Sequence, residues 1–136
     1  MRYEIYVKKK RRSDTYKFNL FHRVNQKAYK LAMEIFELSR GFPKDEKYSL
    51  TDQIRRSSRS ITSNLAEAWA KRRYEKSFVN KLTDSLGEEL ETEVWLDYSK
   101  DCGYLQKETH ENHINEYLEV RKILISMINN PEKWCL

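Results

Sequence analysis

The sequence predicts an all-α protein, specifically an up-down four-helix bundle. Four stretches of roughly 20 to 28 residues carry apolar side chains at three- and four-residue intervals, the spacing that lines one face of an α-helix. The chain of 136 residues holds only three glycines and two prolines, which argues against a turn-rich β fold. Because the connections between the stretches are short, consecutive helices are expected to run antiparallel within one domain, residues 18–136.

Residues 1–17 are predicted to form a flexible basic arm outside that domain. They hold seven Lys and Arg residues against two acidic ones, a net charge of +5, which equals the net charge of the whole chain. The rest of the chain is therefore neutral overall. The arm contains one continuous basic run: Lys8, Lys9, Lys10, Arg11 and Arg12. Such a run can bind phosphates by counterion release or serve only as a solvating tail, and the sequence leaves both interpretations open.

The first helix is expected from about Leu20 to Arg40. Its apolar residues form a narrow seam with alternating spacings of three and four: Phe21, Val24, Ala28, Leu31, Ile35 and Leu38. Gly41 is predicted to end this helix in a left-handed conformation, and Pro43 then prevents it from continuing. Gly103 is expected to stop a later helix in the same way.

The second helix is expected from about Leu50 to Ala70. Ser49 and Asp52 resemble a capping box at its start. Three polar residues lie on or beside its apolar stripe: Ser57, Ser58 and Asn64. A buried polar group without a partner costs about 1–3 kcal/mol, so this helix is expected to specify a particular packing or assembly.

The third and fourth helices, expected at Tyr74–Asp101 and Glu108–Asn129, carry more apolar surface than one neighbour can cover. In the third helix a stripe spaced strictly by four winds round the rod: Phe78, Leu82, Leu86, Leu90 and Val94. In the fourth helix the apolar residues lie nearly all round: Ile123, Leu124, Ile125, Met127 and Ile128. Because soluble monomers rarely expose such surface, the bundle is expected to self-associate.

Several blocks of sequence, spread over roughly residues 18–133, support a family resemblance. The blocks are Gly41-Phe-Pro-Lys-Asp-Glu-Lys-Tyr48, Gln53-Ile-Arg-Arg-Ser57, Ser60-Ile-Thr-Ser-Asn-Leu-Ala-Glu67, Trp95-Leu96 and Met127-Ile-Asn-Asn-Pro-Glu-Lys133. In these blocks the chain resembles the bacterial four-helix-bundle proteins encoded by intervening sequences of 23S rRNA genes. It departs from that pattern at Thr62, where the family usually has proline, and at Ala68, where glycine is usual.

This resemblance implies a homopentamer of four-helix bundles and no enzymatic activity. It also implies kinship with the accessory protein of diversity-generating retroelements, which is similar in fold, is basic, and works with a reverse transcriptase and nucleic acid. Nucleic-acid binding is therefore expected by analogy.

A polar network is predicted between the second and third helices. Four of its residues lie along one side of the second helix: Arg56, Ser60, Asn64 and Glu67. Three residues of the third helix can meet them: Glu88, Glu91 and Thr92. The network either fixes helix register and subunit docking, or forms a site that receives RNA or a partner peptide. It contains no nucleophile paired with a base, so no enzyme activity is predicted.

A second cluster of basic residues is a candidate phosphate-binding patch: Arg55, Arg59, Arg72, Arg73 and Lys76. Trp69 and Tyr74 are its candidate stacking platforms. The alternative is that these cations pair with carboxylates of the third helix, in the same or a neighbouring subunit.

No cofactor, metal or membrane partner is predicted. His110, His113 and Glu116 are attributed to an exposed helix start, because metal sites generally need a better-focused ligand set. Cys102 and Cys135 show no metal or redox spacing, which indicates reduced thiols in a cytoplasmic protein. No apolar run approaches the roughly 20 residues that span a bilayer.

The sequence leaves two functions open. In the first, the protein is a non-enzymatic oligomer that binds RNA or DNA through the arm and the arginine patch. In the second, it is a scaffold or adaptor that docks a protein partner, and its charges serve subunit assembly only. Salt dependence separates the two, because phosphate binding weakens steeply as salt rises.

Overall fold

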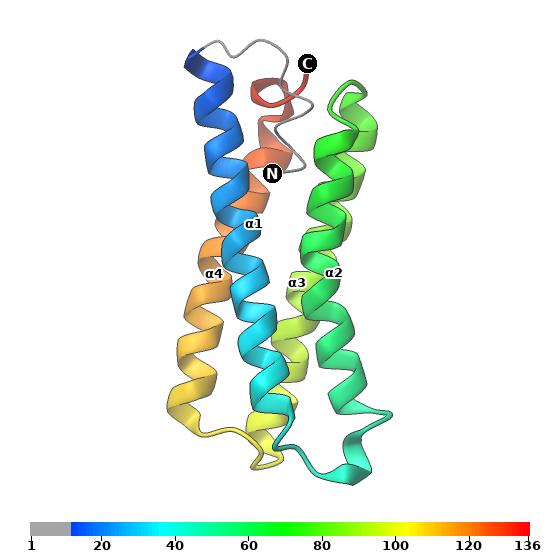
Figure 1. Cartoon of the computed structure of the whole chain (residues 1–136), viewed down its shortest axis with the longest axis vertical. Helices are drawn as coiled ribbons and strands as arrows, with labels where there is room; N and C mark the ends of the chain where they lie inside the picture. Colours follow the sequence, from blue (N-terminus) through cyan, green and yellow to red (C-terminus); the bar gives the residue numbers. More distant parts are fainter. Residues whose placement is uncertain (1–11) are drawn as a thin grey trace.

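The computed structural model describes residues 12–136, with side chains from Asn19 onward. Its helices are α1 (Arg12–Ser39), α2 (Leu50–Ala70), α3 (Glu75–Asp101) and α4 (Lys107–Asn129), with short 3-10 turns η2 (Lys44–Glu46) and η3 (Pro131–Lys133). The four helices alternate in direction along an elongated bundle (Figure 1). Within the described range there is no strand, so the all-α prediction is confirmed.

Helix α1 begins at Arg12, well before the expected start near Leu20. Residues 12–17 of the predicted arm therefore belong to the first helix, whereas residues 1–11, including Lys8, Lys9, Lys10 and Arg11, lie outside the described residues. No glycine or proline interrupts residues 12–19, and a helix already formed gains a backbone hydrogen bond for each residue added. The other predicted helix limits agree with the structure to within one residue.

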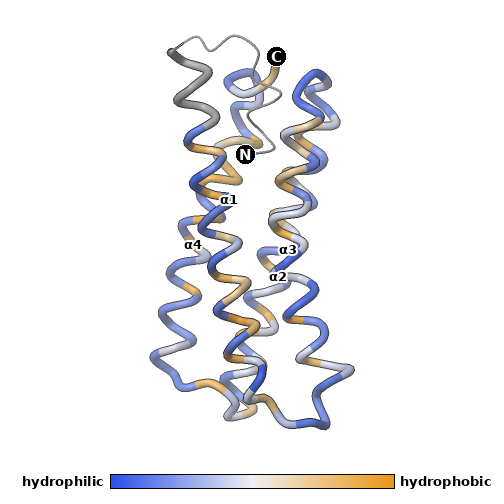
Figure 2. Tube along the Cα trace, viewed as in Figure 1, coloured by the Kyte–Doolittle hydropathy of each residue, from blue (hydrophilic) through white to orange (hydrophobic). Residues whose placement is uncertain are grey.

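The core runs the length of the bundle and is centred on α2. Ile54, Ile61 and Leu65 of this helix are almost completely buried against the seam of α1 that begins at Phe21 and Val24. Figure 2 shows that apolar positions recur along all four helices, whereas the turn between α2 and α3 is hydrophilic. Deleting the side chain of such a core residue costs about 2–5 kcal/mol, which makes this seam the main source of stability.

The buried face of α3 differs from the predicted stripe. Its buried residues alternate in spacings of four and three: Phe78, Leu82, Ser85, Glu89, Thr92, Leu96 and Ser99. Leu90 and Val94 of the predicted stripe are instead 44% and 46% exposed. This agrees with the expectation that the stripe winds round the helix, because a row spaced by four on a helix of 3.6 residues per turn moves away from the core toward Leu90 and Val94.

Small hydroxyl residues fill the contact between α2 and α3. Ser57 and Thr92 are fully buried, and their hydroxyl oxygens lie 2.9 Å apart. The Ser85 hydroxyl donates to the Ile61 carbonyl across the same contact, at 2.8 Å. Because small side chains let backbones approach closely and each hydroxyl has a partner, these residues fix the register of α2 against α3. Ser58, also buried, donates to the Arg55 carbonyl of its own helix.

The helix ends confirm one cap prediction and overturn two. Gly103 has φ +81° and ends α3 as expected, because a left-handed backbone suits glycine. Gly41 has no positive φ; its N–H donates to the Leu38 carbonyl in a tight turn, and Pro43 follows. Ser49 precedes α2, but its hydroxyl donates to the Glu46 carboxylate and accepts from no helix N–H, so the capping box is not formed.

The C-terminal residues fold back over the end of the bundle where α2 meets α3. Trp134 is buried after η3, and the Leu136 N–H donates to the Arg72 carbonyl at 3.1 Å. This segment therefore contacts the turn that follows α2, where Arg72 of the predicted basic patch lies. Among the described helices, none combines the length and the apolar character that a membrane crossing requires.

Candidate functional site

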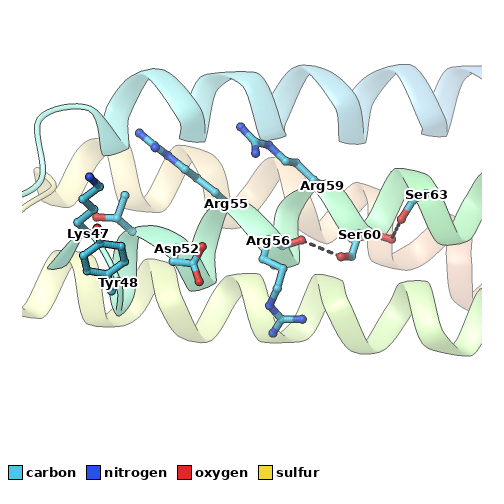
Figure 3. A pocket seen from close by; sticks show the side chains of 9 residues that line it. Lys47, Tyr48, Asp52, Arg55, Arg56, Arg59, Ser60 and Ser63 are labelled. Atoms are coloured by element: carbon cyan, nitrogen blue, oxygen red, sulfur yellow. Dashed lines mark hydrogen bonds between the residues drawn. The ribbon is translucent and has the colours of Figure 1, made fainter.

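A groove of about 590 Å³ follows the outer face of α2 from its start (Figure 3). Its lining residues recur at helical spacing: Lys47, Tyr48, Thr51, Asp52, Arg55, Arg56, Arg59, Ser60 and Ser63. Four of them are basic and one is acidic. We call this surface the α2 groove. It is electropositive because its cations outnumber its single carboxylate, and it contains two of the predicted phosphate-binding arginines.

Arg55 and Arg59 extend from α2 toward α1 (Figure 3). The Arg55 Nε–H donates to Ser39 Oγ at 2.7 Å, and its guanidinium carbon lies 4.8 Å from the centre of the Phe36 ring. The Arg59 guanidinium lies 5.7 Å from the same ring. Neither arginine forms an ion pair with any carboxylate whose side chain the structure describes. One aromatic ring thus supports two cations that retain their charge for an outside partner.

Arg56 points the other way, toward α3 (Figure 3). Its guanidinium donates to Gln53 Oε1 at 3.0 Å and to Glu91 Oε1 at 3.3 Å. The same Glu91 oxygen accepts from the Trp95 indole N–H at 3.3 Å. Arg56 therefore serves the contact between α2 and α3, and Arg55 and Arg59 supply the accessible charge of the α2 groove.

The other members of the predicted basic patch lie at the far end of α2. Arg72 is only 8% exposed; its guanidinium stacks over Trp69 at 3.6 Å and its Nε–H donates to the Trp69 carbonyl. Arg73 and Lys76 are exposed near the turn into α3. At 1.5 Å of rise per residue, the four steps from Arg55 to Arg59 span about 6 Å, whereas Arg55 lies roughly 22 Å from Ala70, the last residue of α2, and Arg73 follows beyond it.

The single patch predicted from the sequence is therefore two separate surfaces, with Arg72 part of neither. Of the two predicted stacking platforms, Trp69 is 2% exposed and cannot receive a base, while Tyr74 is 63% exposed. Trp69 instead packs on Phe21, with ring centres 4.5 Å apart. Packing against Phe21 of α1 explains the burial of Trp69, because sequence spacing alone does not show which residues of another helix cover a side chain.

The predicted polar network forms only in part. Thr92 joins Ser57, and Arg56 joins Glu91, as described above. Ser60 and Asn64 instead hydrogen-bond to backbone carbonyls of their own helix, at 2.8 and 2.9 Å. Glu67 pairs with Lys81 of α3 at 2.6 Å, and this ammonium lowers the pKa of the Glu67 carboxyl. The contacts are those of a register-fixing interface rather than of one connected site.

Glu88, the remaining member of the predicted network, lies one turn from Glu91. Burial raises the pKa of the Glu88 carboxyl, and the adjacent Glu91 carboxylate raises it further. The positive charge of Arg56 opposes this rise. The side of α3 facing α2 thus concentrates negative charge that the single Arg56 balances only in part.

Two groove residues were not singled out by sequence reasoning, Lys47 and Tyr48. They directly precede α2, and the Tyr48 ring is 85% exposed. The Lys47 ammonium lies 5.2 Å from the Tyr48 ring centre. The sequence did contain a signal for these two residues. Basic and aromatic residues often occur together in nucleic-acid-binding surfaces, and Lys47 and Tyr48 lie next to the helix that carries Arg55 and Arg59.

A buried carboxyl group between α3 and α4 was also missed. Glu89 is 0% exposed and makes no hydrogen bond to the described residues. The guanidinium of Arg121 makes two hydrogen bonds of 2.8 Å to Glu93 and lies 3.6 Å from Glu89. Burial first, and then the Glu93 carboxylate, raise the pKa of Glu89 to about 9. Tyr117 is buried beside it, and burial raises the pKa of its phenol.

The histidines at the start of α4 are not exposed as predicted. His110 is 8% exposed and lies 2.7 Å from an Asp97 oxygen, whereas His113 lies 3.3 Å from Glu34 of α1. Each imidazole therefore joins α4 to a different neighbouring helix. Glu116 pairs with Lys27 of α1 at 2.9 Å. The structure groups no three potential metal ligands in the part of the chain that it describes.

Comparison with known proteins connects this fold and groove to a family. The family model of the 23S rRNA-intervening sequence protein matches residues 22–126, which span all of α2 and α3 and most of α1 and α4. The chain belongs to this family. The predicted family resemblance is thereby confirmed, and it covers the α2 groove and the contact between α2 and α3.

A solved structure supports the same assignment. It is a protein of unknown function from the S23 ribosomal protein family of Bacteroides thetaiotaomicron. The two chains are 32% identical and superpose with a TM-score of 0.73, over 81% of this chain and 98% of the other. A comparison with curated proteins gives no significant match.

Proposed function

We propose that this member of the 23S rRNA-intervening sequence protein family is a non-enzymatic protein that binds nucleic acid through the α2 groove. The observation that carries the proposal is the placement of Arg55 and Arg59. They occupy successive turns of α2, share the support of Phe36, and form no ion pair with the described carboxylates. The family name, which refers to rRNA intervening sequences, adds a link to nucleic acid.

The charge distribution favours phosphate over other ligands. Carboxylates are abundant on α3, but Glu91 pairs with Arg56 and Glu93 pairs with Arg121, which leaves the α1 side of the α2 groove positive. Guanidinium groups bind phosphate oxygens bidentately, and one held in place by Ser39 loses less side-chain freedom on binding than a free one does. Exposed Tyr48 adds a ring on which a base can stack.

Salt-dependent binding to a structured RNA and to a single-stranded oligonucleotide tests the proposal. We expect Arg55→Glu/Arg59→Glu to abolish binding that the unchanged protein shows at low salt. For the single-stranded oligonucleotide, Arg55→Ala/Arg59→Ala should reduce the magnitude of the slope of log K against log salt by roughly 1.4, the value for two phosphate contacts on a single strand. The charge-matched control is Arg73→Glu/Lys76→Glu at the far end of α2, which should bind nearly as the unchanged protein does.

If both glutamate variants weaken binding equally, the proteins bind through net charge alone and the α2 groove is not the site. If the unchanged protein binds neither nucleic acid at low salt, the proposed function is wrong. Circular dichroism shows whether each variant is folded, and exposed positions such as Arg59 and Arg73 should tolerate the substitutions.

A docking function is the second candidate, and the exposed apolar surface of α3 and α4 favours it. Leu90 and Val94 of α3 and Ile125 of α4 are 39–46% exposed, on two helices that the pair between Arg121 and Glu93 holds together. We propose that this surface mediates self-association, as the pentamer implied by the family resemblance requires. Light-scattering mass after size exclusion tests it: Leu90→Glu/Val94→Glu should shift an oligomer to the monomer mass, whereas a monomeric unchanged protein would contradict it.

A further inference from the structure

A second hollow opens where α2 begins and α3 ends, beside the α2 groove. It encloses about 460 Å³. Its lining residues are Glu46, Tyr48, Ser49, Leu50, Gln53, Trp95, Tyr98 and Cys102. We call it the aromatic pocket. Tyr48 lines both the aromatic pocket and the α2 groove, so the two surfaces are continuous.

We infer that the aromatic pocket binds an unpaired nucleobase of the nucleic-acid strand whose phosphates occupy the α2 groove. This inference rests on the proposed function. The α2 groove accounts for the phosphates of the ligand, and the aromatic pocket accounts for one of its bases. It also commits the ligand to a single-stranded segment, because a base inside a duplex is stacked and cannot enter a pocket.

The aromatic side chains supply the stacking surface. Tyr48 is 85% and Tyr98 56% exposed, so both rings present accessible faces. Trp95 and Tyr98 lie with ring centres 5.8 Å apart and planes tilted by 35°. The hydrogen bond from the Trp95 indole to Glu91 holds that ring in place. Rings fixed before binding lose little conformational freedom, which is how stacking platforms for bases gain affinity.

The polar side chains at the rim of the aromatic pocket, Glu46 and Gln53, can hydrogen-bond to the edge of a base. Glu46 presents a carboxylate, one oxygen of which accepts from Ser49 at 2.6 Å. The Gln53 carbonyl oxygen accepts from Arg56, while its amide nitrogen donates to none of the described residues. A carboxylate accepts hydrogen bonds and repels phosphate. The pocket therefore favours guanine, whose Watson–Crick edge has two adjacent donors (N1–H and N2–H₂), over uracil, whose single N3–H lies between two acceptors.

Charge orients the strand across α2. The α1 side of the helix carries Arg55 and Arg59 without carboxylate partners among the described side chains, while on the α3 side the charge of Arg56 is paired with Glu91 and the rim of the pocket carries Glu46. Phosphates are therefore attracted more strongly to the first side, and Tyr48 lines both surfaces. A nucleotide that places its phosphate over Arg55 directs its base toward the aromatic pocket.

Cys102 allows the inference to be tested in the folded protein, because it is exposed and lines the aromatic pocket. In a Cys135→Ser protein, a fluorophore on Cys102 should report binding of a short single-stranded RNA with one guanine in a uridine tract. The all-uridine RNA should give a weaker response. The Tyr48→Ala and Tyr98→Ala variants should each bind the guanine-containing RNA about 5- to 150-fold less tightly, the range for loss of one stacking platform.

Tyr29→Ala is the matched control, because Tyr29 is 62% exposed on α1 and lines neither surface. If Arg55→Glu/Arg59→Glu abolishes RNA binding but Tyr48→Ala and Tyr98→Ala bind normally, the pocket inference is overturned and the proposed function stands. If no RNA binds the unchanged protein, both the proposed function and the pocket inference are wrong. A Cys102 signal that saturates with a lysine-rich peptide and not with RNA would show that the pocket takes a cationic side chain, which also overturns the inference.

Discussion

Replacing Glu89 by glutamine should remove a large part of the pH dependence of stability. Glu89 is fully buried between α3 and α4, and Arg121 directs both of its 2.8 Å hydrogen bonds to Glu93. One positive charge therefore faces two carboxyl groups. If both were ionised, the buried cluster would carry a net negative charge, and the folded protein avoids this by keeping Glu89 protonated, with its pKa raised to about 9.

The sign follows from proton binding in the two states. Between a pKa of 4.5 in the unfolded chain and about 9 in the fold, the folded protein holds a proton on Glu89 that the unfolded chain has released. This stabilising contribution is complete below pH 4.5 and is lost as the pH rises through 9. Each pH unit within the window changes the free energy of unfolding by at most about 1.4 kcal/mol. From about pH 5 to about pH 8 the loss is up to roughly 4 kcal/mol.

Urea unfolding of the unchanged protein and of Glu89→Gln at several pH values measures this loss. Glutamine has the shape of the neutral acid and does not titrate, so the difference in unfolding free energy between the two proteins should shift in favour of the variant as the pH rises. Contributions from the other titratable groups are common to both proteins and cancel. Glu37→Gln, whose side chain is 63% exposed, is the control and should leave the pH profile unchanged.

A difference between the unchanged protein and Glu89→Gln that stays constant from about pH 5 to about pH 8 would refute the reasoning. It would mean that Glu89 is ionised in the fold, so that Arg121 serves two carboxylates at once. A variant that is less stable at every pH, by a constant amount, would lead to the same conclusion.

Further predictions concern the glycines and the contact between α2 and α3. Gly87 lies in α3 with open space beside it, so Gly87→Ala should stabilise the fold by about 0.5–1 kcal/mol. Gly103→Ala should destabilise it by about 1–2 kcal/mol, because alanine is strained at φ +81°. Thr92→Val removes the donor to buried Ser57, whose own hydroxyl donates to the Ile54 carbonyl, and should cost about 1–3 kcal/mol, while adding Ser57→Ala should recover part of this loss. Urea unfolding measures all three; equal stability of the two glycine variants, or strict additivity of Ser57→Ala and Thr92→Val, would contradict the respective argument.

The fold was predictable because its signals are local. The seam beginning at Phe21 and Val24, the helix stop at Gly103 and the scarcity of other helix breakers act over a few residues, so the sequence alone shows them. The family resemblance in the blocks around Gln53 and Ser60 strengthened the prediction. The polar residues of α2 were also interpreted correctly as packing devices, since Ser57 is buried and paired with Thr92.

The candidate site was predictable only in part. Arg55 and Arg59 are four residues apart on one helix, so helical geometry alone places them together. Arg72 belongs to the same patch inferred from sequence, yet it is buried: its guanidinium stacks on Trp69, and its carbonyl accepts from Leu136 at the other end of the chain. Tyr48 and Tyr98 meet at one pocket because α2 and α3 run antiparallel. Contacts of this kind depend on how elements pack.

The sequence by itself determined the number of helices, most of their limits and the family, because helical periodicity and caps are set by neighbours along the chain. Only the tertiary structure decided which face of α3 is buried, since the buried face mixes apolar with polar residues. The face containing Ser85, Glu89 and Thr92 packs inward because its small hydroxyl residues match those of α2, and Leu90 and Val94 remain outside. The protonation of Glu89 follows from the burial of this face of α3. Burial disfavours the charged form of the carboxyl group, and no local sequence pattern reveals that Glu89 is buried.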